Sequence, residues 1–192
     1  ISHLDFYLIK MYLIRGQHNL KLFKSRYPNA LLSGTIGNFD GLHLGHQAIL
    51  EKIKNNAQKY NAKTIVFFTE PHAAEYFSKV RDKNQIPPPR ICPWREKFQL
   101  LKKSKIDFAC FLKFNSKLRT MSPDDFISQI LDSINLVSFT VGDDFRFGAG
   151  RKGDTDLLKN WGEKKGILVE NTETITLDGQ RVSSTRIREE LL

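Results

Sequence analysis

Cysteine is scarce in this chain of 192 residues, which contains only Cys92 and Cys110. Two cysteines without a CxxC pair supply neither a disulfide framework nor a four-thiolate zinc site. Unpaired thiols are typical of reducing compartments, so the sequence predicts a cytoplasmic protein. Within the apolar stretch DFACFL, we expect Cys110 to be a small buried side chain.

Long hydrophobic runs are also lacking. No apolar stretch approaches the roughly 20 residues that a helix needs to cross a bilayer, so we expect no membrane partner. The first residues include Asp5 and too short an apolar stretch for a signal peptide. The chain does not begin with methionine, and Met11 followed by YLIRG is typical of a natural start. We therefore expect residues 1–10 to precede that start and residues 11–192 to form one domain.

Acidic residues are outnumbered, because 30 Lys and Arg face 21 Asp and Glu and leave a net charge of +9. A basic surface attracts nucleic acid, acidic membranes or phosphorylated small molecules. The lysines are spread along the chain, which is equally typical of a solvated exterior. No basic stripe with interleaved aromatic residues is evident, so we expect small anionic substrates and no nucleic-acid partner.

What the sequence does contain is an alternation of apolar strands and amphipathic helices. The apolar run 30–36 predicts a strand, and the β-branched and aromatic run 64–69 predicts another. Between them, a helix is expected from Leu44, with Ile49 and Ile53 on its apolar face. A strand, a helix and a second strand form a βαβ unit, which requires parallel strands and a right-handed crossover.

The same alternation continues along the rest of the chain. Further strands are predicted at 108–114, 136–141 and 166–170. Further helices are predicted over 93–103, after the N-cap Ser122, after the N-cap Asp154, and over SSTRIREELL at 183–192. Strands alternating with helices throughout predict an α/β fold with an open, doubly wound parallel sheet.

The segment GNFDGLHLGH, residues 37–46, lies between the first strand of the βαβ unit and its helix. Ligands of open α/β sheets bind at the carboxyl ends of the strands, which is where this segment falls. Its three glycines, Gly37, Gly41 and Gly45, allow the backbone to turn tightly near a ligand. Unpaired N–H groups in the first turn of the helix attract anions, so the segment predicts an anion site.

The two histidines of this segment, His43 and His46, have several possible roles. As metal ligands they lack a third partner nearby, and as a general base they lack a nucleophilic serine or cysteine in the loop. They could simply cap the helix, as an isolated pair often does. The flanking glycines and the strand-to-helix position favour a fourth role, donation of hydrogen bonds to phosphate oxygens.

GNFDGLHLGH resembles the HxGH signature of the nucleotidyltransferase superfamily. More narrowly, the chain is similar to the adenylyltransferase (FAD synthetase) module of bacterial bifunctional riboflavin kinase/FMN adenylyltransferases. HxGH alone is specific only to the superfamily, whereas its combination with the later motifs is specific to this family. The stretches that carry the resemblance are MYLIRGQHNL, VFFTEPHAAEYF, PPRICPWREKFQLL, VGDDFRFGAGRKGD and LDGQRVSSTRIREELL.

The resemblance implies a Rossmann-like nucleotidyltransferase fold that transfers AMP from Mg²⁺-ATP to FMN, giving FAD and pyrophosphate. No covalent enzyme intermediate is implied, because the FMN phosphate is already an anionic nucleophile. Catalytic roles are implied for His43, His46 and Arg188, with His46 favoured for stabilising the transition state. The residues implied in ATP binding are Gly37, Asn38, Phe39, Asp40, Gly45, Gly142, Asp144, Phe145, Arg181, Ser183, Ser184 and Thr185.

Pro71 and His72, within EPH, are implied in FMN binding. The family usually has a proline after this histidine, and Ala73 replaces it here, so the flavin contacts are less firmly implied than the activity. The resemblance implies no ligands for Mg²⁺. Asp40 is a candidate either for orienting its own loop or for holding a metal-bound water.

Several of these motifs have simpler interpretations. His72 could be an ordinary loop residue, and Ser183 and Ser184 could be no more than helix N-caps. Phe145 and Phe147 alternate with an arginine and could stack on a planar ring, yet one of them could equally fill the core. These alternatives stay open at the level of the sequence.

Two other functions also stay open. One is an enzyme of the same superfamily with another acceptor, such as a nicotinamide or pantetheine phosphate, and VGDDFRFG and EPH argue against it. The other is a non-catalytic protein that binds nucleotides or nucleic acid. Family members usually continue into a riboflavin kinase domain, so we expect one to follow Leu192 in the whole protein. The sequence does not fix the oligomeric state, and a monomer is our working expectation.

Overall fold

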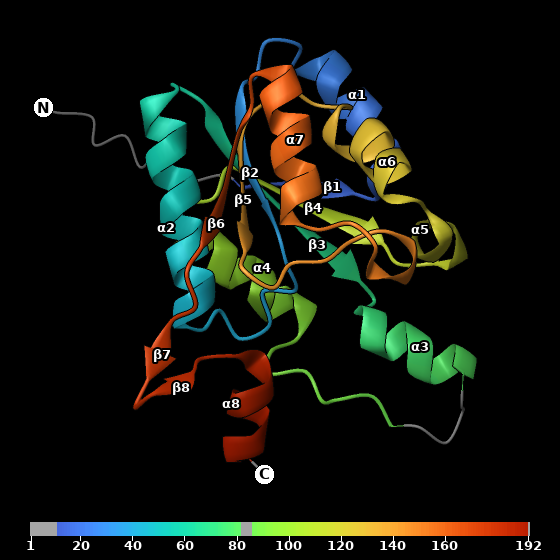
Figure 1. Cartoon of the computed structure of the whole chain (residues 1–192), viewed down its shortest axis with the longest axis vertical. Coiled ribbons are helices and arrows are strands. Elements are labelled where there is room, and N and C mark those ends of the chain that lie inside the picture. The colour runs from blue at the N-terminus through green and yellow to red at the C-terminus, as the bar shows by residue number, and fades with distance from the viewer. Residues whose placement is uncertain (1–10, 82–85, 192) are drawn as a thin grey trace, which may run out of the picture.

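The computed structural model describes residues 11–81 and 86–191. A central sheet of six parallel strands carries helices on both faces, which confirms the predicted fold class (Figure 1). The strands of this sheet are β1 (Tyr12–Arg15), β2 (Leu32–Ile36), β3 (Lys63–Glu70), β4 (Phe108–Lys113), β5 (Leu136–Gly142) and β6 (Leu168–Thr172). The α-helices are α1 (Leu20–Arg26), α2 (Leu44–Lys59), α3 (Ala73–Arg81), α4 (Trp94–Lys103), α5 (Ser116–Thr120), α6 (Pro123–Phe126), α7 (Thr155–Lys165) and α8 (Ser184–Leu191).

Alternating side chains of the strands supply two cores, one on each face of the sheet. In β3, Ile65 and Phe67 join the core beneath α1, α6 and α7. Their neighbours Val66 and Phe68 join the other core, beneath α2 and α4. All four are at most 2% exposed, because a strand covered by helices on both sides has no solvent face. This explains why the strands appear in the sequence as continuous apolar runs.

The order of the strands, β1-β4-β3-β2-β5-β6, fixes where a ligand can bind. From β2 the chain builds outward through β3 to β4, and it then returns to place β5 on the other side of β2. The connections that leave β2 and β5 therefore diverge from each other, and their divergence opens a crevice at the carboxyl ends of these strands. The segment 37–43 leaves β2 at this point.

Several elements were not predicted from the sequence. The edge strand β1 and helices α1, α3 and α5 are short, and short elements give little periodicity. The helix expected after Ser122 begins as α6 and widens into a π-helical turn at Ile127–Leu131, where the Asp132 amide donates to the Ile127 carbonyl at 2.9 Å. Ile127 and Leu131 are nevertheless buried, as their spacing predicts.

The end of the chain differs from the layered body. A two-stranded hairpin, β7 (Thr176–Leu177) and β8 (Gln180–Arg181), leads into α8 below the sheet (Figure 1). The predicted helix over this segment is confirmed, but none of its residues in the described part is buried, and Leu191 is 73% exposed. Polar contacts rather than an apolar face must therefore hold α8 in place.

The close packing of α7 on β6 gives a test of the fold. A Cβ at Gly162 would lie 2.5 Å from Val169 Cγ2 and 2.6 Å from the Ile167 carbonyl oxygen. Alanine is favoured over glycine in a helix by about 1 kcal/mol, but overpacking against a fixed backbone costs about 1–3 kcal/mol more. The overpacking cost less this gain leaves a net loss, so we expect Gly162→Ala to lower the free energy of unfolding by about 1 kcal/mol in urea titrations.

Asn160→Ala on the same helix is the matched control, because Asn160 is exposed and should change stability by less than about 0.5 kcal/mol. A Gly162→Ala protein as stable as the unaltered chain would contradict this account of the α7–β6 contact.

Candidate active site

A cavity of about 250 Å³ lies at the carboxyl ends of β2 and β5, where the strand order predicts a crevice. It is bounded by the segment after β2, the segment after β5, and the stretch 172–184. Most residues that the family resemblance implies in ATP binding line it. These are Gly37, Asn38, Phe39, Gly45, Gly142, Asp144, Phe145, Arg181, Ser183 and Ser184, and the two histidines with implied catalytic roles, His43 and His46, line it as well.

The segment after β2 follows an unusual backbone path. Gly41 has a φ of 79°, and the non-glycine residues Phe39 and Leu42 also have positive φ, at 47° and 40°. Such conformations cost free energy and persist where surrounding contacts enforce them. Here the enforcing contacts are apolar, because Phe39 is fully buried and Leu42 is 6% exposed. The segment is therefore anchored on both sides of Asp40.

His43 and His46 stand together at the start of α2. Their rings stack with centroids 3.7 Å apart, and Phe39 packs against His46 at 4.9 Å. His43 is the N-cap of α2, and its Nδ1 accepts a hydrogen bond of 3.4 Å from the His46 amide. A Cβ at Gly45 would meet the His43 ring at 3.2 Å, so this glycine leaves room for the ring to fold back. The capping interpretation is thus correct for His43, and it leaves the phosphate role open.

Both imidazoles are held neutral. Burial, together with His43 and Lys97, lowers the pKa of His46 to about 3. Burial and the Arg181 cation also lower the pKa of His43. Because His43 Nδ1 accepts a hydrogen bond, its proton lies on Nε2. His46 Nδ1 is buried and has no partner among the described residues, so its other nitrogen is the one available to the cavity.

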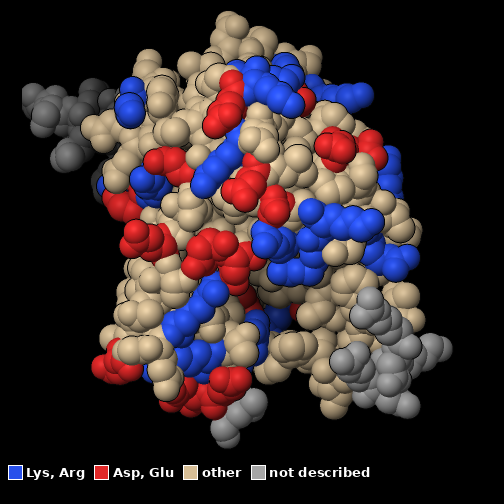
Figure 2. Space-filling model, viewed as in Figure 1, with Lys and Arg blue, Asp and Glu red and all other residues tan. Residues whose placement is uncertain are grey.

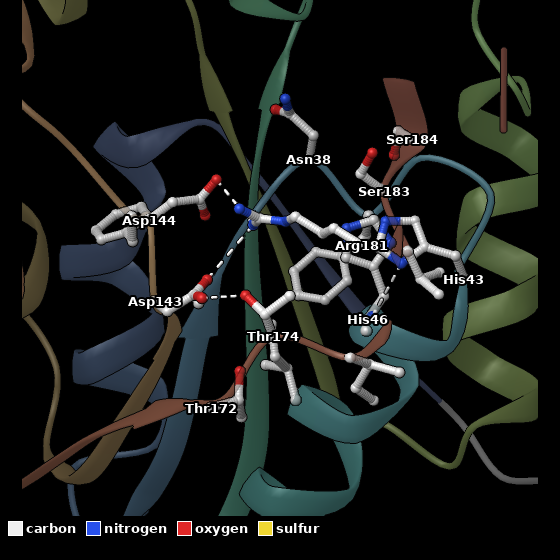
Figure 3. Close-up of a pocket in the computed structure, with 18 of the residues that line it drawn as sticks. Asn38, His43, His46, Asp143, Asp144, Thr172, Thr174, Arg181, Ser183 and Ser184 are labelled. Carbon is white, nitrogen blue, oxygen red and sulfur yellow. Dashed lines mark hydrogen bonds and ion pairs between the residues drawn. The ribbon is translucent and has the colours of Figure 1, made fainter. Parts of the chain in front are cut away.

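Arg181 extends across the cavity toward the segment after β5 (Figure 3). Its guanidinium pairs with Asp144 at 2.8 Å and with Asp143 at 3.4 Å, and Asp143 also accepts a hydrogen bond from Thr174. Arg181 and Asp144 were both predicted to bind ATP, and in this structure they bind each other. Asp143 and Thr174 were not predicted, although the repeated aspartate of VGDDF was a signal for the first.

Ser183 and Ser184 serve different contacts at the start of α8. Ser183 Oγ accepts the Arg186 amide at 3.2 Å, which is the capping role that the sequence left open. Ser184 Oγ instead donates to the Asp40 carbonyl at 3.1 Å. Both serines still line the cavity, facing the α2 start from the opposite side. The segment before α8 is therefore bonded to the histidine loop across the cavity.

Asp40 and Arg188 lie outside the residues that line the cavity and are joined to each other. Arg188 Nη2 donates to Asp40 Oδ2 at 2.6 Å, and its Nε donates to the Pro89 carbonyl. Asp40, 1% exposed, also accepts the amides of Ile91 and Cys92. Burial would raise the pKa of Asp40, but these amides and Arg188 outweigh burial and lower it. Asp40 thus orients its loop, one of the two roles considered for it.

The remaining predicted residues are also outside the cavity. Thr185 follows the two serines but does not line it, and neither do Pro71 and His72. His72 is no ordinary loop residue, because it is 6% exposed and its Nε2 lies 2.9 Å from the Nζ of Lys97. Lys97 itself is fully buried and was not predicted. The available signal was its position four residues before the buried Leu101, on the apolar face of α4.

Phe145 and Phe147, the two phenylalanines after β5, have different surroundings, and each fits one of the two roles considered for them. Phe147 is 6% exposed and belongs to the core, while Phe145 lines the cavity. Their rings stack at 5.7 Å with an interplanar angle of 13°. The core phenylalanine therefore fixes the plane of the ring that faces the cavity, which gives a planar ligand a surface to stack on.

Among residues 11–81 and 86–191, no group of three His, Cys, Asp or Glu side chains is arranged to hold a metal ion. In the same part of the chain no helix has the length and apolar character that crossing a bilayer requires. Cys92 and Cys110 are both free and buried, and the predicted burial of Cys110 is confirmed.

Comparison with known proteins gives consistent matches. A model of the FAD synthetase family matches residues 29–186. The chain is 39% identical over 182 residues to a bifunctional riboflavin kinase/FMN adenylyltransferase of Escherichia coli strain K12, covering 94% of this chain and 55% of that one. A protein of the same name from Haemophilus influenzae is 38% identical over 185 residues, with 94% and 56% covered. The chain thus spans about half the length of the curated relatives it matches.

Solved structures share the fold at lower identity. A structure titled macrolide-efflux protein from Streptococcus pneumoniae aligns with a TM-score of 0.78 at 21% identity, covering 95% of this chain and 58% of that one. A pantoate-beta-alanine ligase from Francisella tularensis aligns with a TM-score of 0.59 at 13% identity, covering 93% and 73%. At these identities the likeness establishes the fold alone.

The Asp40–Arg188 pair gives a test of how the site is assembled. Arg188→Ala leaves a buried carboxylate without its cation, which costs about 3–5 kcal/mol in comparable pairs. We expect the free energy of unfolding to fall by about 3 kcal/mol at neutral pH. Because the folded pKa of Asp40 is lowered, its contribution is present above its unfolded value and lost as the pH falls. The difference from the unaltered chain should therefore shrink below about pH 4.

Arg186→Ala is the matched control on the same helix. Arg186 pairs with the largely exposed Glu190 at 3.7 Å and donates to the exposed carbonyls of Leu177 and Gln180, all groups that water can reach, so the loss should stay below about 1.5 kcal/mol. Equal losses for the two variants, or a loss for Arg188→Ala that is constant from neutral to acidic pH, would contradict the assignment.

Proposed function

The chain belongs to the FAD synthetase family, and we propose that it transfers the AMP moiety of ATP to FMN, releasing FAD and pyrophosphate. The observation that carries this proposal is the cavity between β2 and β5. Neutral histidines and the N-terminus of α2 form one side of it, and Arg181 with Ser183 and Ser184 forms the other. Hydrogen-bond donors thus converge from two sides on a space that suits a polyphosphate.

In the proposed reaction, an oxygen of the FMN phosphate attacks the α-phosphorus of ATP. The bond between the α-phosphorus and the oxygen that bridges to the β-phosphorus breaks, and pyrophosphate leaves with that electron pair. The attacking phosphate is already an anion, so no side chain has to remove a proton from it. The protein's contribution is to align two polyanions and to stabilise the charge that develops on the leaving oxygen.

His46 and His43 are the proposed donors to that charge. A neutral imidazole donates through one nitrogen, and the contacts of His43 leave its Nε2 proton for a phosphate oxygen. His46 is more deeply buried and is packed between His43 and Phe39, so its geometry is fixed before ATP arrives. Donors fixed in advance stabilise a transition state without reorganisation, which favours His46 for the rate effect.

Arg188 has a different part in this proposal from the phosphate contact that the resemblance implies. Its guanidinium is engaged by Asp40 and the Pro89 carbonyl. We propose that it remains there and positions Ser183 and Ser184 against the histidine loop. Arg181 is the better candidate for the phosphates, because its present partners are exposed aspartates that a polyphosphate can replace.

Mg²⁺ is proposed to arrive as the ATP complex. Mg²⁺ usually keeps several waters and takes most of its remaining ligands from phosphate oxygens. The described residues offer no group of three ligands for it, and Asp143, Asp144 and Glu173 are the carboxylates that line the cavity. When bound, the ion would supply positive charge to the phosphates. Asp143 and Asp144 could bind the ion or its waters only after Arg181 has released them.

The further proposals concern substrates and surroundings. Pro71 and His72 are proposed to contact FMN from the β3 side of the site. The face in Figure 2 carries Lys and Arg side chains interspersed with Asp and Glu, which supports small anionic substrates over an extended polyanion. Two free, buried cysteines support a cytoplasmic location. For the oligomeric state, we keep the proposal of a monomer. Riboflavin kinase activity, which the relatives' names also carry, is not proposed for these residues.

The proposal is tested by incubating the chain with Mg²⁺ and ATP labelled on its α-phosphate. We expect the label to appear in a flavin product that co-elutes with FAD when FMN is the acceptor. Nicotinamide mononucleotide and phosphopantetheine, offered in separate reactions, should stay unlabelled. Label in either of those products with none in flavin would contradict the FMN assignment. No labelled product with any acceptor would favour a non-catalytic nucleotide-binding protein.

The proposed role of His46 gives a sharper prediction. His46→Ala removes a donor that acts on the ATP phosphates, so kcat should fall by about 100-fold or more. The dissociation constant for FMN, measured by quenching of flavin fluorescence, should change less than about threefold because the histidine does not bind FMN in this proposal. A loss of FMN affinity with unaltered turnover would contradict the role.

A further inference from the structure

Lys97 is the one fully buried cation among the described residues, and the proposed reaction does not use it. It closes the first turn of α4, four residues before the fully buried Leu101, and so occupies the face that packs on the sheet. Burying an ammonium is costly unless it is well paired. Lysine in such a place therefore calls for a specific partner.

That partner is a histidine rather than a carboxylate. Within the described residues, Lys97 Nζ has a single hydrogen-bond partner, the Nε2 of His72 at 2.9 Å. The same ammonium lies 5.1 Å from the centre of the Phe68 ring, which offers a favourable cation–π contact. His72 is 6% exposed and lies directly before α3. The pair thus connects α4 to the start of α3.

The chemistry of the two groups fixes the proton on the histidine. An ammonium has donors and no acceptor, so Nε2 must present its lone pair to Lys97. A neutral imidazole carries its one proton on the other nitrogen, which here is Nδ1. His72 Nδ1 makes no hydrogen bond within the described residues, and it is not among their buried unpartnered nitrogens. It is therefore an unpartnered donor that keeps some contact with solvent.

We propose that Lys97 is a positioning residue that holds His72 in the neutral, Nδ1-protonated form, so that this nitrogen donates to an oxygen of bound FMN. The inference rests on the proposed function, because it takes FMN as the ligand on this side of the site. It differs from a purely structural role because the ammonium selects the tautomer as well as filling space.

Surrounding charges are consistent with a neutral His72. Burial, then Lys97, then Arg90 lower the pKa of His72 to about 4, and two carboxylates act in the opposite direction. Burial lowers the pKa of Lys97 as well, while nearby anionic groups favour its charged form. The titratable and charged groups that face the pair are Asp40, His46, Glu70, Glu75, Arg90 and Cys92. Arg90 is itself neutralised by bonds to Glu70 and Glu75.

The first experiment reads the tautomer directly. The chain contains five histidines, so ¹⁵N-histidine NMR gives few signals, and that of His72 is assigned by its loss in His72→Gln. We expect the unaltered chain to show Nδ1–H and a lone pair on Nε2 between about pH 5 and 8. Lys97→Met keeps the length and removes the ammonium. In it the Nε2–H form should appear and the midpoint of His72 titration should rise. An unchanged tautomer and titration in Lys97→Met would overturn the proposal.

The second experiment measures binding with matched variants of His72. Glutamine places its amide near the Nε2 position and keeps a partner for Lys97, but it has no donor at Nδ1. Asparagine places its amide near Nδ1 and gives up the Lys97 contact. We expect His72→Gln to weaken FMN binding about tenfold and His72→Asn to weaken it clearly less. The reverse order would overturn the proposal, and this pair needs no change at Lys97.

The third experiment separates positioning from general support. Lys97→Met should weaken FMN about tenfold and leave the KM for ATP within about twofold. In a His72→Ala background, Lys97→Met should cause no further loss of FMN affinity, because the lysine acts through the histidine. Additive losses would overturn the proposal. The NMR readout needs neither substrate nor turnover, so a failure of FAD synthesis is distinguishable from a failure of this inference.

Discussion

The buried carboxylate of Asp40 is the contact on which the assembly of the site depends. Its side chain accepts the amides of Ile91 and Cys92 and the guanidinium of Arg188, and its carbonyl accepts the hydroxyl of Ser184. One residue thus joins the loop after β2 to two segments that are distant in the sequence. Because none of the described side chains of α8 is fully buried, apolar packing can replace little of what these bonds contribute. The bonds from Asp40 to Ser184 and Arg188 therefore hold the start of α8 against the cavity, opposite the histidines.

The two sides of that cavity differ in how firmly they are built. His43 and His46 are stacked, partly buried and neutral, on a loop whose backbone is held by apolar anchors. Across from them, Arg181 is bound by exposed Asp143 and Asp144 in a high-dielectric setting where such pairs contribute little. A polyphosphate can therefore exchange with these carboxylates at low cost, while the histidine side stays as it is. This combination gives a fixed geometry for the reacting phosphorus and an adjustable clamp for the rest of the ligand.

The sequence predicted the helices, strands and turns that are determined by residues close together in the chain. Strands covered on both faces are continuous apolar runs, and glycines in the loop after β2 mark its turn, so β2, α2 and β3 and the place of the site could be derived. The contacts that complete the site could not be derived, because Asp40 and Arg188 are 148 positions apart and a charged residue suggests an exposed surface. Lys97 was missed for the same reason. The family resemblance named Asp40 and Arg188 but could not say that they bind each other.

The buried charges beneath the loop are best explained by the chemistry above them. Asp40, Lys97 and His72 occupy positions under the site where packed apolar side chains would commonly be at least as stable. An apolar layer would leave the loop without its bonds to Ile91 and Arg188, and it would leave the imidazole free to take either tautomer. Each polar group in the layer therefore specifies an arrangement that packing alone would not select. Buried side chains are usually apolar, and the chain departs from that rule where the proposed reaction would require one orientation of the loop and one proton position on the imidazole.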